Sequence, residues 1–144
     1  MEQNWYQFIE QEFGVEPKDI RTYSPLTLAY IGDGVFDLII RSVVVGKGNT
    51  SPNKLHQFTS QIVKATTQSA MIDSLEDILS EEEMDVYRRG RNAKSHSVAK
   101  NASVGDYRKA TGFEALIGYL YLRNQIERIV ELILVAIDKC NVNL

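Results

Sequence analysis

The fold is decided by residues 24–46, SPLTLAYIGDGVFDLIIRSVVVG. Ser24 followed by Pro25 is typical of a helix start, because a serine side chain caps free backbone amides and proline suits the first helical position. Gly46 follows some twenty apolar-rich residues and is typical of a helix end. The stretch therefore predicts one long, largely buried helix that carries two acids, Asp33 about two turns from its start and Asp37 one turn later.

Helix-start signals recur through the rest of the chain, and no long segment alternates between apolar and polar residues. Ser51-Pro52 repeats the first signal, and Ser80 followed by three glutamates predicts a capping box. The further helices are expected over four stretches: Ser51 toward Met71, Ser80 to about Arg88–Gly90, residues 106–123 and residues 125–139. Residues 92–105 lack periodicity and are expected to form a loop. These patterns predict an all-α fold, with residues 1–144 forming a single domain.

The composition favours an ordinary soluble globular protein. The chain has 144 residues, of which 44% are hydrophobic and 24% charged, enough for a substantial core. No stretch approaches the ~18 apolar residues of a membrane span, and the N-terminus has no basic and apolar leader. Cys140 is the only cysteine, which excludes an intramolecular disulfide and a cysteine zinc site. A cytoplasmic location is expected.

Two acids lie in apolar helical sequence, far apart in the chain. Asp33 is flanked by Gly32 and Gly34, each of which costs about 1 kcal/mol relative to alanine inside a helix. Such glycines indicate that another backbone or a ligand comes close. Glu114 has a similar setting, with Gly118 one turn later. If the two helices pack at ~8–10 Å, their inward carboxylates reach one shared cation. The pattern alone leaves open that each acid is merely solvated or paired with a lysine or arginine.

Positive charge is concentrated between the two acids. Residues 88–109 hold seven lysines and arginines and one acid, a net charge of +6 in a chain of net charge −3. Such a segment is often only a solvated face. Beside two carboxylates, however, it indicates a surface that holds a polyanion next to a bound cation. His96, a loop histidine among arginines, is expected to contact phosphate or to have no role, rather than to act as a general base. The candidate polyanion-binding residues are Arg88, Arg89, Arg91, Asn92, Lys94, His96 and Lys100.

Three motifs in the chain resemble those of the ribonuclease III family. They are Ala29 to Asp33 (AYIGD), Arg89 to Lys94 (RGRNAK) and Thr111 to Leu122 (TGFEALIGYLYL). The resemblance covers roughly residues 20–135 and is strongest to the short bacterial branch called Mini-ribonuclease III. That branch lacks the double-stranded-RNA-binding domain.

The resemblance implies a magnesium-dependent endoribonuclease that cleaves double-stranded RNA. Asp33 and Glu114 would be the catalytic acids and the Mg²⁺ ligands, and the basic segment would grip the duplex. The resemblance further implies a homodimer with one such site per subunit. It also implies the large-subunit (23S) ribosomal RNA precursor as substrate, with a ribosomal protein or the preribosome as a candidate partner.

Three acids of full-length ribonuclease III are absent, and their positions hold Leu26, Ala29 and Thr111. The short branch lacks them as well, so the number of metal ions per site stays open. Asp37, one turn beyond Asp33, is expected to have a solvent or interface role. One alternative is a catalytically silent domain that binds structured RNA or the ribosome, although retention of both Asp33 and Glu114 argues against it. A purely structural dimerisation module is a second alternative, but it leaves the basic segment unexplained.

Overall fold

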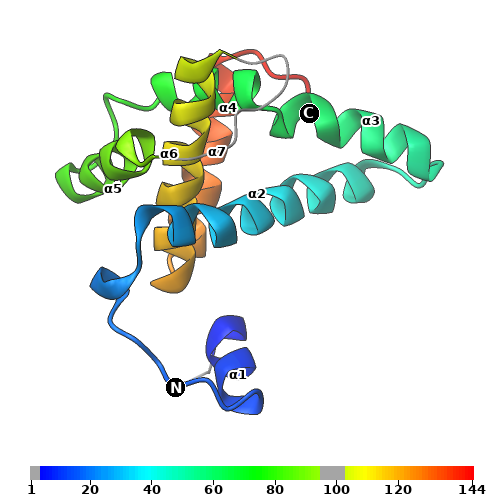
Figure 1. The fold of residues 1–144 in the computed structure, drawn as a ribbon. Helices are drawn as coiled ribbons and strands as arrows, with labels where there is room; N and C mark the ends of the chain where they lie inside the picture. Colours follow the sequence, from blue (N-terminus) through cyan, green and yellow to red (C-terminus); the bar gives the residue numbers. More distant parts are fainter. Residues whose placement is uncertain (1–3, 95–102) are drawn as a thin grey trace.

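The computed structural model describes residues 4–94 and 103–144, and these residues form helices and loops without a strand (Figure 1). The prediction of an all-α fold is confirmed. The helices in chain order are α1 (Trp5–Glu12), the 3-10 helix η1 (Ile20–Thr22), α2 (Pro25–Lys47), α3 (Pro52–Val63), α4 (Ala65–Asp73), α5 (Glu81–Asn92), α6 (Val104–Leu122) and α7 (Ile126–Lys139).

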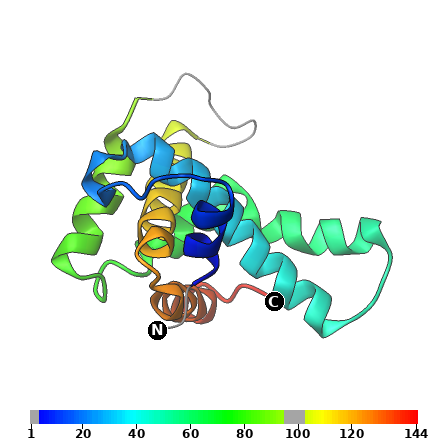
Figure 2. The same ribbon diagram turned by 90° about the horizontal axis from the view of Figure 1, so that it is seen from below.

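The centre of the molecule is α6, which packs against α2, α4, α5 and α7. Its residues 115–121 are all buried, as expected of a helix that is apolar on every side. Phe36 of α2 meets Phe113 of α6 edge to face, with ring centroids 5.6 Å apart. The far half of α2 and the adjacent α3 extend to one side of the other helices (Figure 2). No helix in the described ranges is both long and apolar enough to cross a membrane.

Four serines cap helices. Three of them, Ser24, Ser51 and Ser80, confirm the predicted helix starts. Each serine hydroxyl accepts a hydrogen bond from the backbone N–H three residues later. The fourth, Ser103, caps α6 in the same way. It lies in the segment predicted as loop, so α6 begins slightly earlier than expected.

The stretch predicted as one helix from Ser51 toward Met71 is divided into α3 and α4. At Lys64 the backbone is extended, with φ −71° and ψ 154°. The corner is held by Thr67 of α4, whose hydroxyl donates to the Gln61 carbonyl oxygen of α3 at 2.8 Å. This carbonyl belongs to the last turn of α3, where the helix itself supplies no partner. No glycine or proline marks the break, so the sequence carries no local signal for it.

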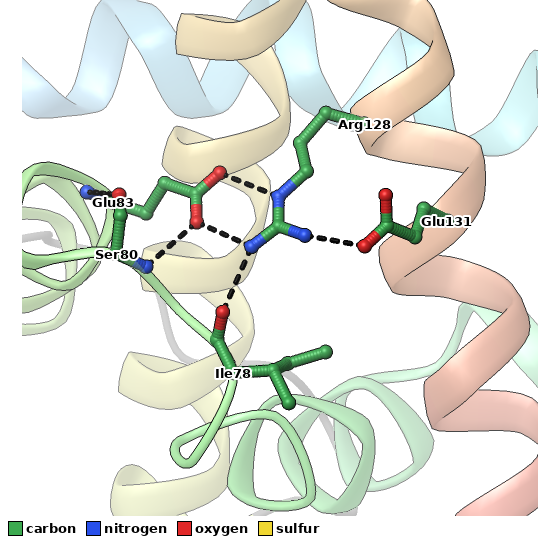
Figure 3. A network of polar contacts seen from close by, with 5 residues as sticks. All are labelled: Ile78, Ser80, Glu83, Arg128 and Glu131. Carbon is green, nitrogen blue, oxygen red and sulfur yellow. Dashed lines mark hydrogen bonds and ion pairs between the residues drawn. The ribbon is translucent and has the colours of Figure 1, made fainter.

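A polar network ties α5 to α7 (Figure 3). Arg128 of α7 donates to both carboxylate oxygens of Glu83, each at 2.8 Å, and to the Ile78 carbonyl oxygen at 2.9 Å. Arg128 also donates to Glu131 at 2.6 Å. Glu83 accepts the Ser80 backbone N–H as well, so one carboxylate caps α5 and anchors it to α7. Hydrogen bonding by Arg128 is the main reason that the pKa of Glu83 is lowered.

Candidate active site

Helices α2 and α6 cross where both carry glycine. A methyl group on Gly32 would lie 1.7 Å from the Glu114 carbonyl oxygen, and one on Gly118 would lie 2.0 Å from the Leu28 carbonyl oxygen. Neither position has room for a Cβ atom, so the two backbones touch directly. This confirms the expected close approach at Gly32. A methyl group on Gly34 would meet no atom of the described chain within 4 Å, so that glycine faces open space.

The crossing brings Asp33 and Glu114 together as the acid pair of the site. Glu114 is mostly buried beneath the crossing, whereas Asp33 is exposed at its rim. Burial raises the pKa of Glu114 to about 9, and hydrogen bonding with Asp33 and the negative charge of Asp33 add to the effect. Without a cation, the acid pair therefore holds a proton at neutral pH.

A third side chain, Gln68 of α4, reaches the buried end of the site. Its amide favours the ionised form of Glu114 and so opposes the rise in pKa of that carboxyl group. Gln68 is almost completely buried. It was not predicted as a site residue, because a lone glutamine in the segment ATTQSAMID shows no pattern that indicates burial beside a carboxylate.

The donors suit a hard divalent cation that keeps much of its water. In the described ranges, no cluster of three or more His, Cys, Asp or Glu residues could hold a metal ion. The hydroxyl of Thr111, where full-length relatives have an acid, donates to the Tyr107 carbonyl oxygen of its own helix at 3.0 Å. Asp37 is ion-paired with Arg41 at 2.6 Å. Two facing carboxylates are a typical protein contribution to Mg²⁺, which takes its remaining ligands from water and phosphate.

The first part of the basic segment is helical, which corrects the expected loop boundary. Helix α5 continues to Asn92, two residues past the predicted end at Gly90. A methyl on Gly90 would lie 2.7 Å from the Ala115 Cβ atom and 2.9 Å from the Gly112 Cα atom of α6. Gly90 is therefore a packing residue rather than a helix stop, and the local sequence does not distinguish these two uses.

The predicted RNA-binding residues differ in their availability. Arg88 and Arg89 on α5, and Lys94 just beyond it, are exposed and have no ion-pair partner among the residues that the structure describes. Arg91 is half-buried, with its guanidinium 5.5 Å from the centre of the Tyr87 ring.

Asn92 is a direct neighbour of the basic groups. Its side-chain oxygen accepts a hydrogen bond from the Nε atom of Arg91 at 3.2 Å. His96 and Lys100 lie outside the described residues. The structure therefore gives positions for five of the seven predicted RNA-binding residues.

Comparison with known proteins identifies the family. The family model of the ribonuclease III domain matches residues 26–125 of the sequence, which is more than half of the chain. This chain belongs to the ribonuclease III family. Similar proteins include the Mini-ribonuclease 3 of Clostridium tetani, 48% identical over 91% of this chain and 86% of the relative. The Mini-ribonuclease 3 of a Thermoanaerobacter species is 42% identical over 96% of this chain and 97% of the relative.

A solved structure supports the same assignment. The crystal structure of a protein from Fusobacterium nucleatum matches with a TM-score of 0.77 and 33% sequence identity, covering 85% of this chain and 99% of that one. Membership in the ribonuclease III family, in its Mini-ribonuclease 3 branch, confirms the resemblance seen in the three sequence motifs. The chain is accordingly an endoribonuclease.

Proposed function

We propose that this ribonuclease III enzyme cleaves double-stranded RNA with Mg²⁺ held by Asp33 and Glu114, and that residues 1–144 form one catalytic domain. The observation that carries the proposal is the acid pair, a mostly buried carboxyl group facing a second one at the α2–α6 crossing. Two carboxylates in this arrangement repel each other unless a proton or a cation lies between them. When bound, the cation would activate water for attack on the phosphodiester and stabilise charge on the phosphate.

Asp33 and Glu114 differ in burial, and we assign them different roles accordingly. Gly32 lies in close contact with the Glu114 backbone, so the Glu114 carboxylate is attached to a closely packed part of the fold. Asp33 lies at the rim, where a phosphate group can approach. This arrangement presents one oxygen-rich edge to an incoming RNA backbone.

We further propose that RNA binds to the basic end of α5 and the residues after it. The members of this surface are Arg88, Arg89, Arg91, Asn92, Lys94, His96 and Lys100. The support is that Arg88, Arg89 and Lys94 are exposed, and that α5 packs directly on α6 through Gly90 and Gly112, close to Glu114 in sequence. Duplex RNA is bound mainly through phosphates and 2′-hydroxyl groups, for which cationic and amide side chains are suited.

A homodimer is supported by the exposed face of α2. Tyr30, Leu38 and Val45 are 83%, 45% and 62% exposed and, with Gly34, follow helical spacing along one side of the helix. The exposed Arg41 lies between Leu38 and Val45 on this side. Exposed apolar side chains that gather on one face mark interaction sites. Because this face carries residues on both sides of Asp33, a two-fold dimer through it would bring two acid pairs to one duplex, one for each strand.

The physiological role rests on the motif resemblance alone. We propose that the enzyme matures the ends of the large-subunit (23S) ribosomal RNA precursor in the cytoplasm, with a ribosomal protein or the preribosome as a candidate partner. Mapping of 23S ends in cells that lack the protein tests this role. Unchanged ends would remove it and leave the proposed chemistry untouched.

The chemistry is tested with a long RNA duplex, Mg²⁺ or a chelator, and the variants Asp33→Asn and Glu114→Gln. Cleavage is expected only with Mg²⁺ and only in the unmodified protein, and each variant should lose more than the ~10–100-fold that changes outside the metal ligands cost. Circular dichroism shows whether the variants stay folded. A protein that binds duplex RNA but cuts none with any divalent cation would instead be a silent RNA-binding domain.

A further inference from the structure

A buried amide without a partner lies beside the acid pair. Gln68 is only 2% exposed, and its Nε2 group has no hydrogen-bond acceptor among the described residues. An unmade hydrogen bond of this kind costs about 1–3 kcal/mol. Such groups are uncommon in folded proteins and call for a specific explanation.

The acceptor that the amide faces is the Glu114 carboxylate. The Gln68 amide acts on Glu114 as a donor that favours its ionised form, although the two groups do not meet the geometry of a completed hydrogen bond here. The Gln68 side chain therefore lies beside the carboxylate, and its Nε2 group is unpaired among the described residues.

Two further contacts hold α4 against α6, both from residues that follow Gln68 on α4 and precede Glu114 on α6. The Ser69 hydroxyl donates to the Asp106 carboxylate at 2.8 Å, and Lys109 forms an ion pair with Asp73 at 2.9 Å. These contacts tie the helix that carries Gln68 to the helix that carries Glu114.

We propose that Gln68 is a positioning residue of the acid-pair site, whose amide donates to one oxygen of Glu114 and leaves the other oxygen facing Asp33 and the cation. The proposal rests on the metal site proposed above. A neutral donor suits this place because it orients a carboxylate without adding a positive charge that would compete with the cation. Groups that orient metal ligands from behind commonly change metal affinity by ~10–100-fold when they are removed.

The test uses the full chain without metal and the variants Gln68→Leu and Gln68→Met, which keep the bulk of the side chain and remove the donor. Binding of Mn²⁺, a paramagnetic substitute for Mg²⁺, is measured at one fixed pH from the electron paramagnetic resonance signal of the free ion. We expect about 10–100-fold weaker Mn²⁺ binding in both variants. The metal-free melting temperature should stay equal or rise, because a buried unsatisfied donor has been removed.

Ser69→Ala is the matched control, since Ser69 is the buried polar neighbour of Gln68 and bonds to Asp106 away from the acid pair. It should lower the melting temperature and leave Mn²⁺ affinity unchanged. The proposal is overturned if both Gln68 variants bind Mn²⁺ like the unmodified protein, whatever happens to their melting temperature.

Asp33→Asn and Glu114→Gln separate this outcome from failure of the metal site itself. If they also bind Mn²⁺ normally, the proposed metal site is wrong. If they lose Mn²⁺ and the Gln68 variants do not, only the role of Gln68 fails. Should Gln68→Leu not fold, the isosteric Gln68→Met variant decides.

Discussion

Glu114 is a residue whose ionisation the fold opposes. Its carboxyl group is mostly buried, and it faces the carboxylate of Asp33, so both desolvation and repulsion oppose a negative charge there. Gly32 lies against the Glu114 backbone and Gly118 against the Leu28 backbone, so the two helices hold this carboxyl group at their crossing. Because the two carboxylates repel each other, the bound proton of the acid pair can be replaced by a cation that neutralises the same charge.

The raised pKa predicts how stability changes with pH. The pKa of Glu114 is about 9 in the folded protein against an ordinary 4.5, so the folded state holds more protons than the unfolded state between these values. The metal-free protein should therefore lose stability as pH rises across this window, by up to about 1.4 kcal/mol per pH unit from this group. Urea unfolding in chelator, at one protein concentration, measures it.

Glu114→Gln is the reference for this measurement, because it cannot titrate at that position. The unfolding free energy of the unmodified protein minus that of Glu114→Gln should fall as pH rises. Added Mg²⁺ should make this difference depend less on pH. Parallel curves across the window would show that Glu114 titrates normally.

At the scale of helices, the crossing of α2 and α6 predicts opposite effects at two neighbouring glycines. Gly32→Ala should destabilise the protein by at least the ~1–3 kcal/mol typical of overpacking and should abolish cleavage, because the added methyl collides with the Glu114 carbonyl oxygen. Gly34→Ala meets no atom within 4 Å in the described chain and gains helix propensity, so the fold should be retained. Thermal melts of both variants give the comparison, and equal losses would mean that the crossing is less tight than described.

The basic end of α5 gives a second prediction at this scale. Replacing Arg88 and Arg89 by glutamine should weaken binding to duplex RNA and reduce the slope of log affinity against log salt by about one unit per lost phosphate contact. Helical content should not change, because both side chains are exposed and have no ion-pair partner among the described residues. Lys54→Gln with Lys64→Gln, on and beside α3, removes the same charge elsewhere. Equal effects of the two double variants would assign the binding to net charge rather than to α5.

At the scale of the whole molecule, the exposed face of α2 predicts a dimer that cuts both strands. The enzyme should behave as a dimer in light scattering and should leave staggered ends with short 3′ overhangs, because two acid pairs related by a two-fold axis act on opposite strands. Leu38→Asp should yield monomers with much lower activity. Leu134→Asp changes an equally apolar, 62% exposed residue on α7 and should leave the dimer intact. An active monomer, or blunt ends, would contradict the two-site arrangement.

Much of this molecule was predictable from sequence because its signals are local. Serine caps mark helix starts within four residues, and the cost of Gly32 inside a helix indicates a close approach, although Gly34 on the other side of Asp33 faces open space. What was missed depends on tertiary contacts. Gly90 is a helix-packing residue only because α6 lies against it, and the break at Lys64 depends on a hydrogen bond between two helices. Gln68 gains its importance only once α4 is placed beside Glu114.

The glycine contact between α2 and α6 links the stability of the fold to catalytic activity, two properties that depend on different parts of the molecule in many enzymes. In many enzymes a flexible lid or loop melts first, and activity is lost while the scaffold remains folded. Here the two acids proposed for the chemistry lie at the close glycine contact between the two central helices, α2 and α6. Thermal inactivation and the loss of tertiary structure should therefore follow a single curve, so that residual activity reports directly on how many molecules remain folded.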